Sequence, residues 1–375
     1  MPPDPGAAPS VAQVPLAGPT TLRLGGPAQR FAEAADDVEL VAQVRAADER
    51  GEPLLVLGGG SNLVVADAGF PGTVVHVATR GTRHKPDGDS VILTVAAGED
   101  WDTVVAGTAA DGLAGLECLS GIPGLAGATP IQNVGAYGQE VAQTLVAVRG
   151  YDRERGEVVD LAAAECGFGY RTSSFKRSLR SRAADGPAVT GRFVVLGVTF
   201  RLERSAESAP VRYAELARVL GIGEGARAPL AEVRSAVLAL RRRKGMVLDA
   251  ADPDTRSAGS FFTNPVLDLA GFAALERAVA ATCGPNTQVP TFPAGPGQVK
   301  VPAAWLIERA GFAKGYAPGP DGGARISAKH TLALVNAGSA STAALLALAR
   351  EIRDGVHAAF GVTLHPEPIL IGVTF

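Results

Sequence analysis

Apolar positions recur with two different periods along the first eighty residues, and together they predict a strand-helix-strand unit. Short apolar runs at 30–34, 53–57 and 72–77 have the length and composition of strands. Between the first two runs, either Asp36 or Asp37 is placed to cap a helix. Apolar residues then follow at helical spacing: Leu40, Val41, Val44 and Ala47. This first region is therefore expected to have α/β organisation.

From about residue 80 the pattern changes to longer strands. Runs at 90–98, 144–152 and 193–202 predict strands, and the last alternates as a sheet strand does. Asp102 is the expected N-cap of a helix over 103–110, which Gly112 ends. A second lobe of strands with one helix follows from this pattern.

The third region begins after a polar stretch near residue 205. A helix is predicted over 229–244, with basic residues at its C-terminal end, where the helix dipole favours them. A further helix is predicted over 342–360, between the N-cap Ser341 and the terminating Gly361. The chain then ends in a predicted strand within 366–375.

Residues 119–140 form a long segment that is rich in glycine and has no helical or strand period. Loops of this length inside a domain are usually functional or disordered. Its Leu, Ile, Val and Tyr residues argue against disorder. We expect backbone N–H groups and the Gln132 and Asn133 amides to face a planar ligand such as a flavin. The alternative is a structural loop packed on its own apolar residues.

Composition limits the class of protein. The 375 residues predict two or three domains at roughly 150 residues each, and 46% hydrophobic with 19% charged residues is an ordinary soluble composition. The net charge of −3 gives no electrostatic case for nucleic-acid binding. No run of 18 apolar residues is present, so no membrane partner is expected.

The ends and the cysteines agree with a cytoplasmic protein. Residues 1–15 have neither the basic nor the apolar part of a signal peptide and predict a flexible tail. Cys118, Cys166 and Cys283 are few, odd in number and far apart. This pattern argues against a disulfide framework and against a zinc site, and it suits a reducing compartment.

Two glycine-bearing motifs suggest chemistry without deciding it. The glycine turn "LGGGSN" at 57–62 follows a predicted strand, as phosphate-binding turns do, but it lacks the third glycine of the dinucleotide fingerprint and the lysine of a P-loop. Ser260, in "AGSFFTNP", has no nearby histidine and no nucleophile-elbow pattern. A strand serine bonded to the local backbone is the alternative.

Three charged or titratable positions complete the candidates. Arg171, in "FGYRTSSFK", is either a stacked surface residue or a carboxylate clamp. Glu367 lies between two prolines, which make the local backbone rigid. Arg241–Lys244 is either a solvated helix end or a phosphate site, and His330 either a structural residue or a catalyst. No metal-ligand spacing is present, so no metal is expected.

Five motifs, in this order, resemble the flavin-dependent UDP-N-acetylenolpyruvoylglucosamine reductases, from about Thr20 to the C-terminus. The motifs are "LGGGSNLV", "GIPGLAGATPIQNVGAYG", "FGYRTSSFK", "AGSFFTNP" and the terminal "PEP". The resemblance implies an α+β fold, with a two-lobed FAD-binding domain of the vanillyl-alcohol-oxidase type and a C-terminal substrate-binding domain.

The implied domain boundaries follow the pattern changes. After the tail of residues 1–15, the first FAD lobe is expected over 16–79, joined by the terminal strand 369–375. The second lobe is expected over 80–204. The substrate-binding region is expected over 205–368, including a loop that carries Tyr213.

The resemblance also implies FAD as cofactor, NADPH as hydride donor and UDP-N-acetylglucosamine enolpyruvate as substrate, acted on by a monomer. Arg171 and Glu367 would act on the substrate carboxylate, and Ser260 would donate a proton to carbon. The implied substrate-binding residues are Tyr170, Tyr213, Lys244, Asn264 and His330, the last replacing a glutamine of other members. The implied FAD-binding residues are Leu57, Gly58, Gly59, Gly60, Ser61, Asn62, Gly124, Ala128, Thr129, Pro130, Gln132, Asn133, Gly135, Ala136, Tyr137 and Gly138.

Two other functions are the alternatives, the first of them on the same FAD scaffold. A flavin oxidase would pass electrons to oxygen and would not need Ser260. A non-catalytic flavin-binding or nucleotide-sugar-binding module would bind its ligand without turnover.

Overall fold

The computed structural model describes residues 13–183, 189–319 and 323–375, and the chain divides into two compact units. Unit 1 comprises residues 1–16, 26–60 and 68–240, and unit 2 comprises 17–25, 61–67 and 241–375. Each unit is described by itself. Of the predicted tail, residues 1–12 lie outside the described residues.

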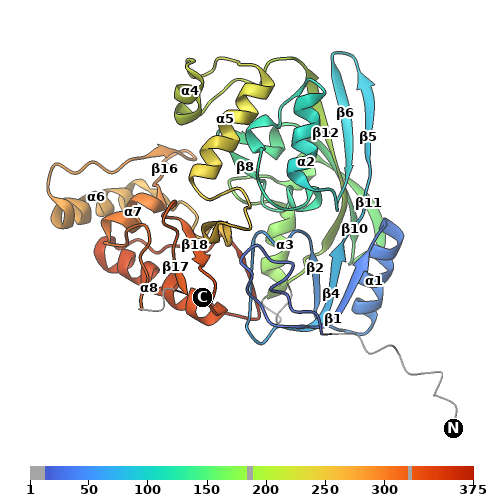
Figure 1. Ribbon diagram of the computed structural model, residues 1–375, viewed down its shortest axis with the longest axis horizontal. Coiled ribbons are helices and arrows are strands. Elements are labelled where there is room, and N and C mark those ends of the chain that lie inside the picture. Colours follow the sequence, from blue (N-terminus) through green and yellow to red (C-terminus); the bar gives the residue numbers. More distant parts are fainter. Residues whose placement is uncertain (1–12, 184–188, 320–322) are drawn as a thin grey trace, which may run out of the picture. The chain divides into compact units, whose positions relative to one another are not determined.

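Unit 1 begins with the predicted strand-helix-strand unit, which is confirmed. The sheet is parallel, with β4 between β1 and β2. Helix α1 (Asp37–Glu49) follows β1 in sequence and lies beside this sheet (Figure 1). Its N-cap Asp36 accepts the Glu39 N–H at 2.8 Å. The strands are β1 (Ala28–Ala34), β4 (Phe70–Val77) and β2 (Leu54–Leu57).

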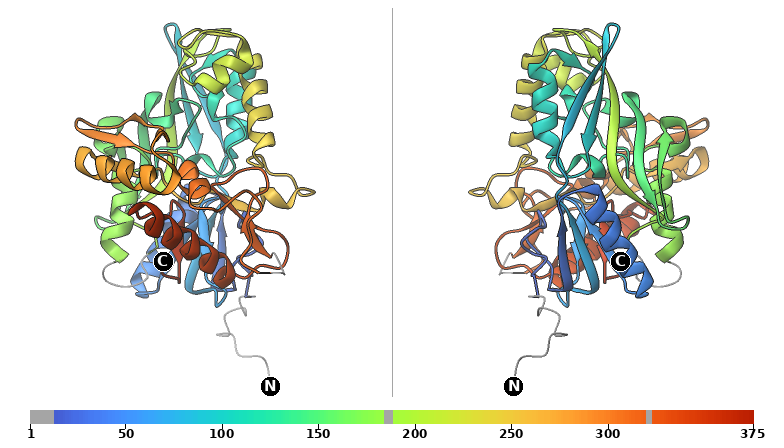
Figure 2. Two further views of the ribbon diagram at one scale, coloured as in Figure 1. Left: turned by 90° about the vertical axis from the view of Figure 1, so that its left-hand side faces the viewer. Right: turned by 90° about the vertical axis from the view of Figure 1, so that its right-hand side faces the viewer.

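The second sheet of unit 1 is antiparallel and has the order β11-β10-β12-β6-β5, with β7 paired to β12. Helix α2 (Trp101–Ala110) packs on it through Trp101, whose ring centroid is 5.7 Å from that of Phe200. Figure 2 shows α2 and α5 (Leu230–Arg243) on the same face of this sheet. The strands are β11 (Glu157–Ala162), β10 (Leu145–Asp152), β12 (Phe193–Arg204), β6 (Ser90–Ala96), β5 (Thr82–Asp87) and β7 (Leu113–Ala114).

The predicted cap of α2 is wrong. Asp100, not Asp102, is the N-cap of the helix, and its carboxylate accepts the Thr103 N–H at 2.8 Å. Asp102 lies in the first turn, and its carboxylate accepts two hydrogen bonds from Arg234 of α5 at 2.7 and 3.0 Å. It also accepts the Gly121 N–H at 2.6 Å. Two aspartates two positions apart satisfy the capping pattern equally in sequence, and only the tertiary partner Arg234 separates their roles.

Short elements punctuate the rest of unit 1. The segment 119–140 is a largely irregular loop stiffened by brief turns and a two-residue hairpin. The elements are η1 (Glu117–Leu119), η2 (Ala126–Ala128), β8 (Gly135–Ala136), β9 (Gln139–Glu140), η3 (Val141–Gln143), η4 (Ala163–Cys166), α3 (Ser174–Ala183) and α4 (Ala214–Leu220).

Unit 2 combines small sheets with the helices α6, α7 and α8, and Figure 1 shows α7 and α8 beside β17 and β18. Its sheets have the orders β13-β18-β17, β14-β16-β15 and β19-β3. The helical elements are η5 (Pro253–Thr255), α6 (Leu269–Cys283), α7 (Ala303–Arg309) and α8 (Thr342–Phe360). The strands are β3 (Leu63–Val65), β13 (Ser257–Ser260), β14 (Val266–Asp268), β15 (Phe292–Pro293), β16 (Gln298–Lys300), β17 (Ala324–Ile326), β18 (Ala333–Asn336) and β19 (Ile369–Ile371).

The prediction for α8 is confirmed at both ends. Ser341 accepts the Ala344 N–H at 3.0 Å, and Gly361 ends the helix with φ of 69°. The terminal strand is shorter than expected, because β19 covers only three residues and pairs in parallel with β3. The apolar pattern of 366–375 extends beyond the part that has a strand partner.

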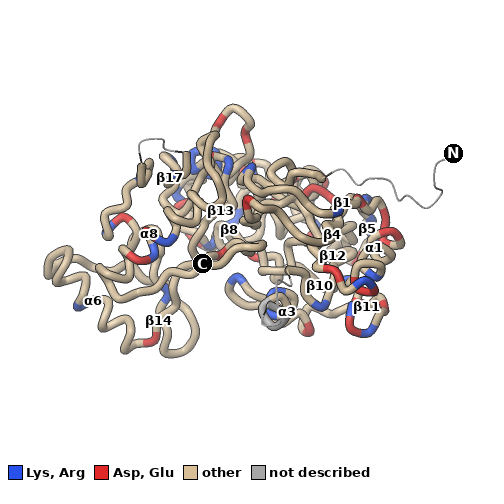
Figure 3. Tube along the Cα trace, turned by 90° about the horizontal axis from the view of Figure 1, so that it is seen from below, with Lys and Arg blue, Asp and Glu red and all other residues tan. Residues whose placement is uncertain are grey.

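The charges of unit 1 are mixed rather than segregated. Figure 3 shows basic and acidic residues interspersed around α1, β10 and β11. Among them, Arg153 pairs with Asp48, and Arg192 pairs with Asp152. Within the described part of the chain, no helix is long and apolar enough to cross a membrane.

Candidate active site

In unit 1 the glycine turn after β2 and the long loop meet backbone to backbone. A Cβ atom placed on Gly59 would lie 2.7 Å from the Gly124 Cα. Only glycine at position 59 permits this approach. Gly124 is held in turn by its carbonyl, which accepts the Trp101 N–H at 3.0 Å. Gly59 of the turn and Gly124 of the loop therefore lie side by side within unit 1.

Gly59 is a half-buried residue, and its N–H has no hydrogen-bond acceptor among the residues that the structure describes. Leaving a buried donor unpaired costs about 1–3 kcal/mol, which a bound anion removes. Successive backbone N–H groups in glycine turns are known diphosphate sites. This turn therefore fits the diphosphate of a dinucleotide.

A second turn, Gly169–Thr172, carries Tyr170 and Arg171 at its tip and is fastened to the loop 131–135. Three hydrogen bonds make the connection. The Asn133 amide donates to the Gly169 carbonyl at 3.2 Å, Arg171 Nη2 donates to the Gly135 carbonyl at 2.8 Å, and the Ser173 hydroxyl donates to the Ile131 carbonyl. The Arg171 guanidinium is thereby fixed against the predicted flavin loop.

Backbone strain concentrates in the same place. Non-glycine residues with positive φ include Asn133 at 48°, Tyr137 at 48° and Arg171 at 51°. Each such conformation costs on the order of 1–3 kcal/mol and persists only where surrounding contacts enforce it. Because all three are sequence-predicted site residues, the strain supports a functional assignment of this region.

The other predicted residues of the loop have structural contacts. The Thr129 hydroxyl donates to the Ala126 carbonyl at 2.7 Å, and the Gln132 amide oxygen accepts from Lys176 Nζ at 3.1 Å. Asn133 is buried, and its amide also donates to Glu140 at 2.7 Å and accepts the Ala142 N–H at 3.1 Å. Asn133 therefore braces the loop through its side chain. The remaining loop positions lie at or between these anchors: Ala128, Pro130, Ala136 and Gly138.

Tyr213, which precedes α4, packs against Tyr137 of the loop. Their ring centroids are 5.3 Å apart and nearly perpendicular. Tyr213 is 39% exposed and Tyr170 is 40% exposed. An exposed tyrosine combines an apolar ring with a polar end, and so suits contact with a ligand that has both kinds of group.

In unit 2, Ser260 and Glu367 lie on adjacent antiparallel segments. Ser260 ends β13, and the next residue, Phe261, accepts the Glu367 N–H at 2.8 Å through its carbonyl. Phe262 and Pro366 form a β-bridge. Among the described residues, none hydrogen-bonds to the Ser260 hydroxyl, which removes the main reason for the structural reading of this serine.

His330 belongs to the same part of unit 2. Its carbonyl accepts the Ala333 N–H at 3.0 Å, and Ala333 is the β18 partner of Ser260. Burial, and then the nearby charges of Lys244, Lys314 and Arg241, lower the pKa of His330 to about 4. The imidazole is therefore neutral at neutral pH, in a cationic environment that suits an anionic ligand.

The last predicted residues of unit 2 have backbone roles as well. The Asn264 side-chain oxygen accepts the Ala303 N–H at 2.9 Å, at the start of α7. The Asn62 carbonyl accepts the Ile369 N–H at 2.9 Å and joins the residues after Ser61 to the terminal strand. In unit 1, Leu57 and Gly60 of the glycine turn are buried.

Comparison with known proteins identifies the family. A model described as an FAD binding domain matches residues 28–162, and one described as the C-terminal domain of UDP-N-acetylenolpyruvoylglucosamine reductase matches 252–371. A reductase of that name from Thermobifida fusca is 58% identical over 362 residues, which cover 96% of this chain and 98% of that protein. The chain belongs to the UDP-N-acetylenolpyruvoylglucosamine reductase family. A Streptomyces coelicolor member is 57% identical, with 96% and 89% covered.

A solved structure of this family agrees. The reductase from Thermus caldophilus has a TM-score of 0.62 and 26% identity, and the match covers 96% of this chain and 98% of that one. The predicted family, the α+β fold with an FAD-binding and a C-terminal domain, and FAD as cofactor are confirmed. The chain is an FAD-binding oxidoreductase.

Sequence reasoning missed residues that hold the site without facing a ligand. Ser173, which is fully buried, anchors the Arg171 turn, and Asp102 anchors the start of the long loop at Gly121. Glu117, also buried, was not singled out. Ser173 stood inside a quoted motif, but no local signal distinguished Glu117, because its partners are distant in sequence.

Proposed function

We propose that this chain reduces UDP-N-acetylglucosamine enolpyruvate to UDP-N-acetylmuramate with NADPH as the electron source. The observation that carries the proposal is the Arg171 turn, strained at φ of 51° and bonded to the Gly135 carbonyl at 2.8 Å. A strained, fixed guanidinium beside a flavin loop suits recognition of a carboxylate. The name of the family supplies the substrate.

The residues for FAD are the glycine turn 58–60 and the loop 124–138. When bound there, FAD would supply two-electron hydride chemistry between NADPH and the terminal methylene carbon of the enol ether. The Gly59 N–H and its neighbours hold the diphosphate. The loop, braced by Asn133, presents its backbone to the flavin.

Arg171 lowers the barrier by binding the substrate carboxylate. As hydride adds to the methylene carbon, an electron pair moves toward the carboxylate and forms an enolate-like state. A fixed guanidinium stabilises this charge more than it stabilises the ground state, which is the condition for catalysis. Glu367, on rigid backbone between two prolines, hydrogen-bonds to the same group.

Ser260 completes the reduction by donating one proton to the carbon next to the carboxylate. The hydride and this proton together add two hydrogens across the double bond, and water restores the serine proton. A donor of this kind needs no histidine base, in agreement with the absence of one near Ser260 in sequence. Its hydroxyl is not engaged by any described residue.

The remaining candidates bind the nucleotide-sugar. Tyr213 covers the diphosphate, and Lys244 and neutral His330 face the same anionic part of the substrate. Tyr170 and Asn264 contact the rest of it. The product is a precursor of peptidoglycan, and we place the reaction in the cytoplasm and assign it to a single chain.

An anaerobic titration tests the proposal. The purified protein should show the flavin absorbance, lose it on addition of NADPH, and regain it on addition of UDP-N-acetylglucosamine enolpyruvate without oxygen. Recovery only in air would favour a flavin oxidase. Bound flavin that NADPH does not bleach would favour a non-catalytic binding module.

A further inference from the structure

Glu117 is a buried carboxylate in η1, 1% exposed, and within the described residues it forms no ion pair. Its carboxylate accepts only N–H donors. Gly115 N–H donates to Oε2 at 2.7 Å, while Gln139 Nε2 and Ala209 N–H donate to Oε1 at 3.0 and 2.7 Å. Burying a charge is costly unless several donors stabilise it, so this arrangement must serve the structure around it.

The three donors come from three separate segments. Gly115 precedes η1, and Gln139 begins β9 of the hairpin whose turn is Tyr137-Gly138. Ala209 belongs to residues 205–213, which follow the end of β12 and lead to Tyr213; we call them the Tyr213 segment. One oxygen, Oε1, therefore bridges the hairpin and the Tyr213 segment. Gln139 adds a second tie, because its side-chain oxygen accepts the Cys118 N–H at 2.8 Å.

The hairpin turn touches the Tyr213 segment directly. A Cβ on Gly138 would lie 3.2 Å from the Arg212 carbonyl oxygen. Tyr137 and Gly138 both have positive φ, at 48° and 82°, as a two-residue hairpin turn requires. The residues that follow Gly138 and Arg212 in sequence extend this contact. Tyr213, after Arg212, packs its ring on Tyr137, and Gln139, after Gly138, donates to Glu117.

The residues before Tyr213 form a ribbon with the residues before α5. Residues 206–211 pair with 226–230, for example through Ser208 N–H to the Ala228 carbonyl at 2.8 Å, while the Ser205 N–H donates outside the ribbon, to the Gly112 carbonyl at 2.9 Å. Val211 packs in a small core of buried residues from 211–240. Among the described residues, Cys118 is the one buried member of this core from outside that range, and Tyr137 packs against it. The Ala209 N–H is the backbone donor that points from the ribbon to the buried Glu117.

We propose that Glu117 is a positioning residue that fixes the Tyr213 segment against the Tyr137 hairpin, and so sets the geometry with which Tyr213 meets the nucleotide-sugar. This proposal rests on the proposed function of Tyr213. Glu117 contacts neither substrate nor cofactor. It acts on binding through the ribbon, because two of its three donors flank the Tyr137–Tyr213 contact.

Glu117→Gln tests the proposal, since it keeps the shape but replaces one acceptor oxygen by a donor. Whichever way the amide points, at least one N–H group faces another N–H group. We expect the KM for UDP-N-acetylglucosamine enolpyruvate to rise on the order of tenfold, with kcat changed less than twofold. Flavin reduction by NADPH should keep its wild-type rate.

A double-mutant comparison separates positioning from general damage. If Glu117 acts through Tyr213, then Glu117→Gln should raise the KM of the Tyr213→Phe protein by less than twofold. If the double variant shows the product of the two single-variant increases in KM, the proposal is wrong. It is also wrong if Glu117→Gln keeps the wild-type KM. Should Glu117→Gln not fold, Gln139→Met is the second variant: it keeps Glu117, removes the hairpin donor together with the acceptor of the Cys118 N–H, and should raise the KM in the same way.

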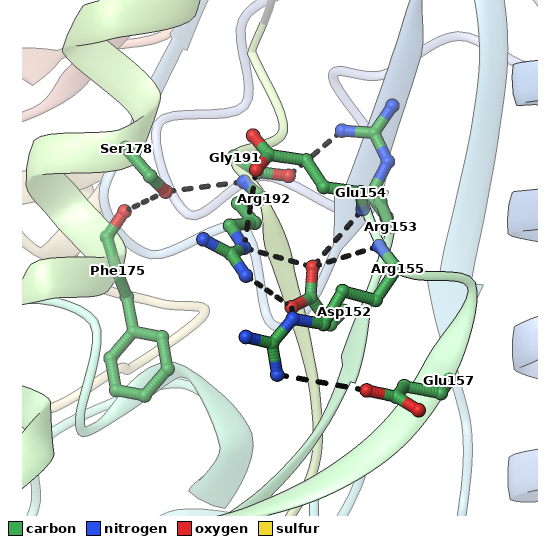
Figure 4. A network of polar contacts seen from close by, with 9 residues as sticks. All are labelled: Asp152, Arg153, Glu154, Arg155, Glu157, Phe175, Ser178, Gly191 and Arg192. Atoms are coloured by element: carbon green, nitrogen blue, oxygen red, sulfur yellow. Dashed lines mark hydrogen bonds and ion pairs between the residues drawn. The ribbon is translucent and has the colours of Figure 1, made fainter.

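Asp152→Asn is the matched control. Asp152 is also 1% exposed and also accepts backbone N–H groups, from Glu154 at 3.0 Å and Arg155 at 3.4 Å, together with two donors from Arg192 (Figure 4). Asp152 pairs with Phe193 at the start of β12, whereas the Tyr213 segment follows the end of β12. The two ends of this 12-residue strand are about 36 Å apart at the usual rise per residue. This variant should keep the wild-type KM. If the wild-type protein shows no turnover, the proposed function is wrong. The hydrogen bonds of Glu117 are then tested by the rate of hydrogen exchange of the backbone amides in 206–213, which Glu117→Gln should raise.

Discussion

Replacing Arg171 by lysine should impair the reduction of the substrate although the positive charge is kept. Arg171 Nη2 donates to the Gly135 carbonyl at 2.8 Å, and this bond holds the guanidinium plane. In the proposed function, the guanidinium held in this way binds the substrate carboxylate. A lysine ammonium is a point charge on a flexible chain and cannot hold the loop carbonyl and grip a carboxylate with two parallel bonds.

The expected magnitude follows from the loss of one fixed donor to the developing charge. Such a loss costs about 2.7–4 kcal/mol in the transition state, or about 10²–10³ in rate. Stability should change little, because lysine at φ of 51° has the same backbone strain as arginine. Anaerobic stopped-flow absorbance measures the two half-reactions separately. NADPH reduction of the flavin should be unaffected, and reoxidation by substrate should slow.

Arg177→Lys is the control for this variant. Arg177 lies six positions further along, is exposed, and donates to the Gly167 carbonyl at 3.1 Å. It should react like the wild type in both half-reactions. If Arg171→Lys also reoxidises at the wild-type rate, Arg171 is not the carboxylate clamp.

Three further predictions concern substrate binding and pH. Tyr213→Phe should weaken substrate binding by the roughly 1.5–3 kcal/mol of a hydrogen bond to a charged group, which raises the KM with a smaller change in kcat. An unchanged KM would make Tyr213 a structural residue of its segment. The pKa of His330, lowered to about 4 by burial and by Lys244, Lys314 and Arg241, should rise when an anionic nucleotide-sugar binds, as NMR titration of the imidazole would reveal. Because the unfolded chain takes up this proton near pH 6.5, the stabilisation is complete above that pH and is lost as the pH falls toward 4. Denaturant titrations should show this loss in the wild type and not in His330→Gln, and equal pH profiles would contradict the assignment.

Elements with strong local signals were predictable from sequence. Helix α8 lies between Ser341 and Gly361 as the capping pattern indicates, and α1 begins after Asp36. Strand β5 was not predicted, because all its residues are exposed and no apolar alternation marks it. The wrong cap at Asp102 had a similar cause: its partner Arg234 is 132 positions away.

The site divides in the same way. Motifs predicted the glycine turn, the long loop, Arg171 and Ser260, because these residue types stand in short recognisable strings. Glu117 could not be found from its neighbours, since its role depends on donors at positions 115, 139 and 209 that only the fold brings together. Residues that position a site leave weaker local signals than residues that face a ligand.

The central claim is that Ser260 protonates carbon after hydride has been transferred, and Ser260→Ala tests it most directly. Anaerobic stopped-flow traces of the wild type and the variant should give equal rates of flavin reduction by NADPH. Reoxidation by UDP-N-acetylglucosamine enolpyruvate should be slower in the variant by at least the ~10²–10⁴ of a lost general acid. Ser260→Cys should recover part of that rate, because a thiol is still a proton donor. Equal reoxidation rates in the wild type and Ser260→Ala would contradict the account, and an equal loss in both half-reactions would assign Ser260 to the fold or the flavin site instead.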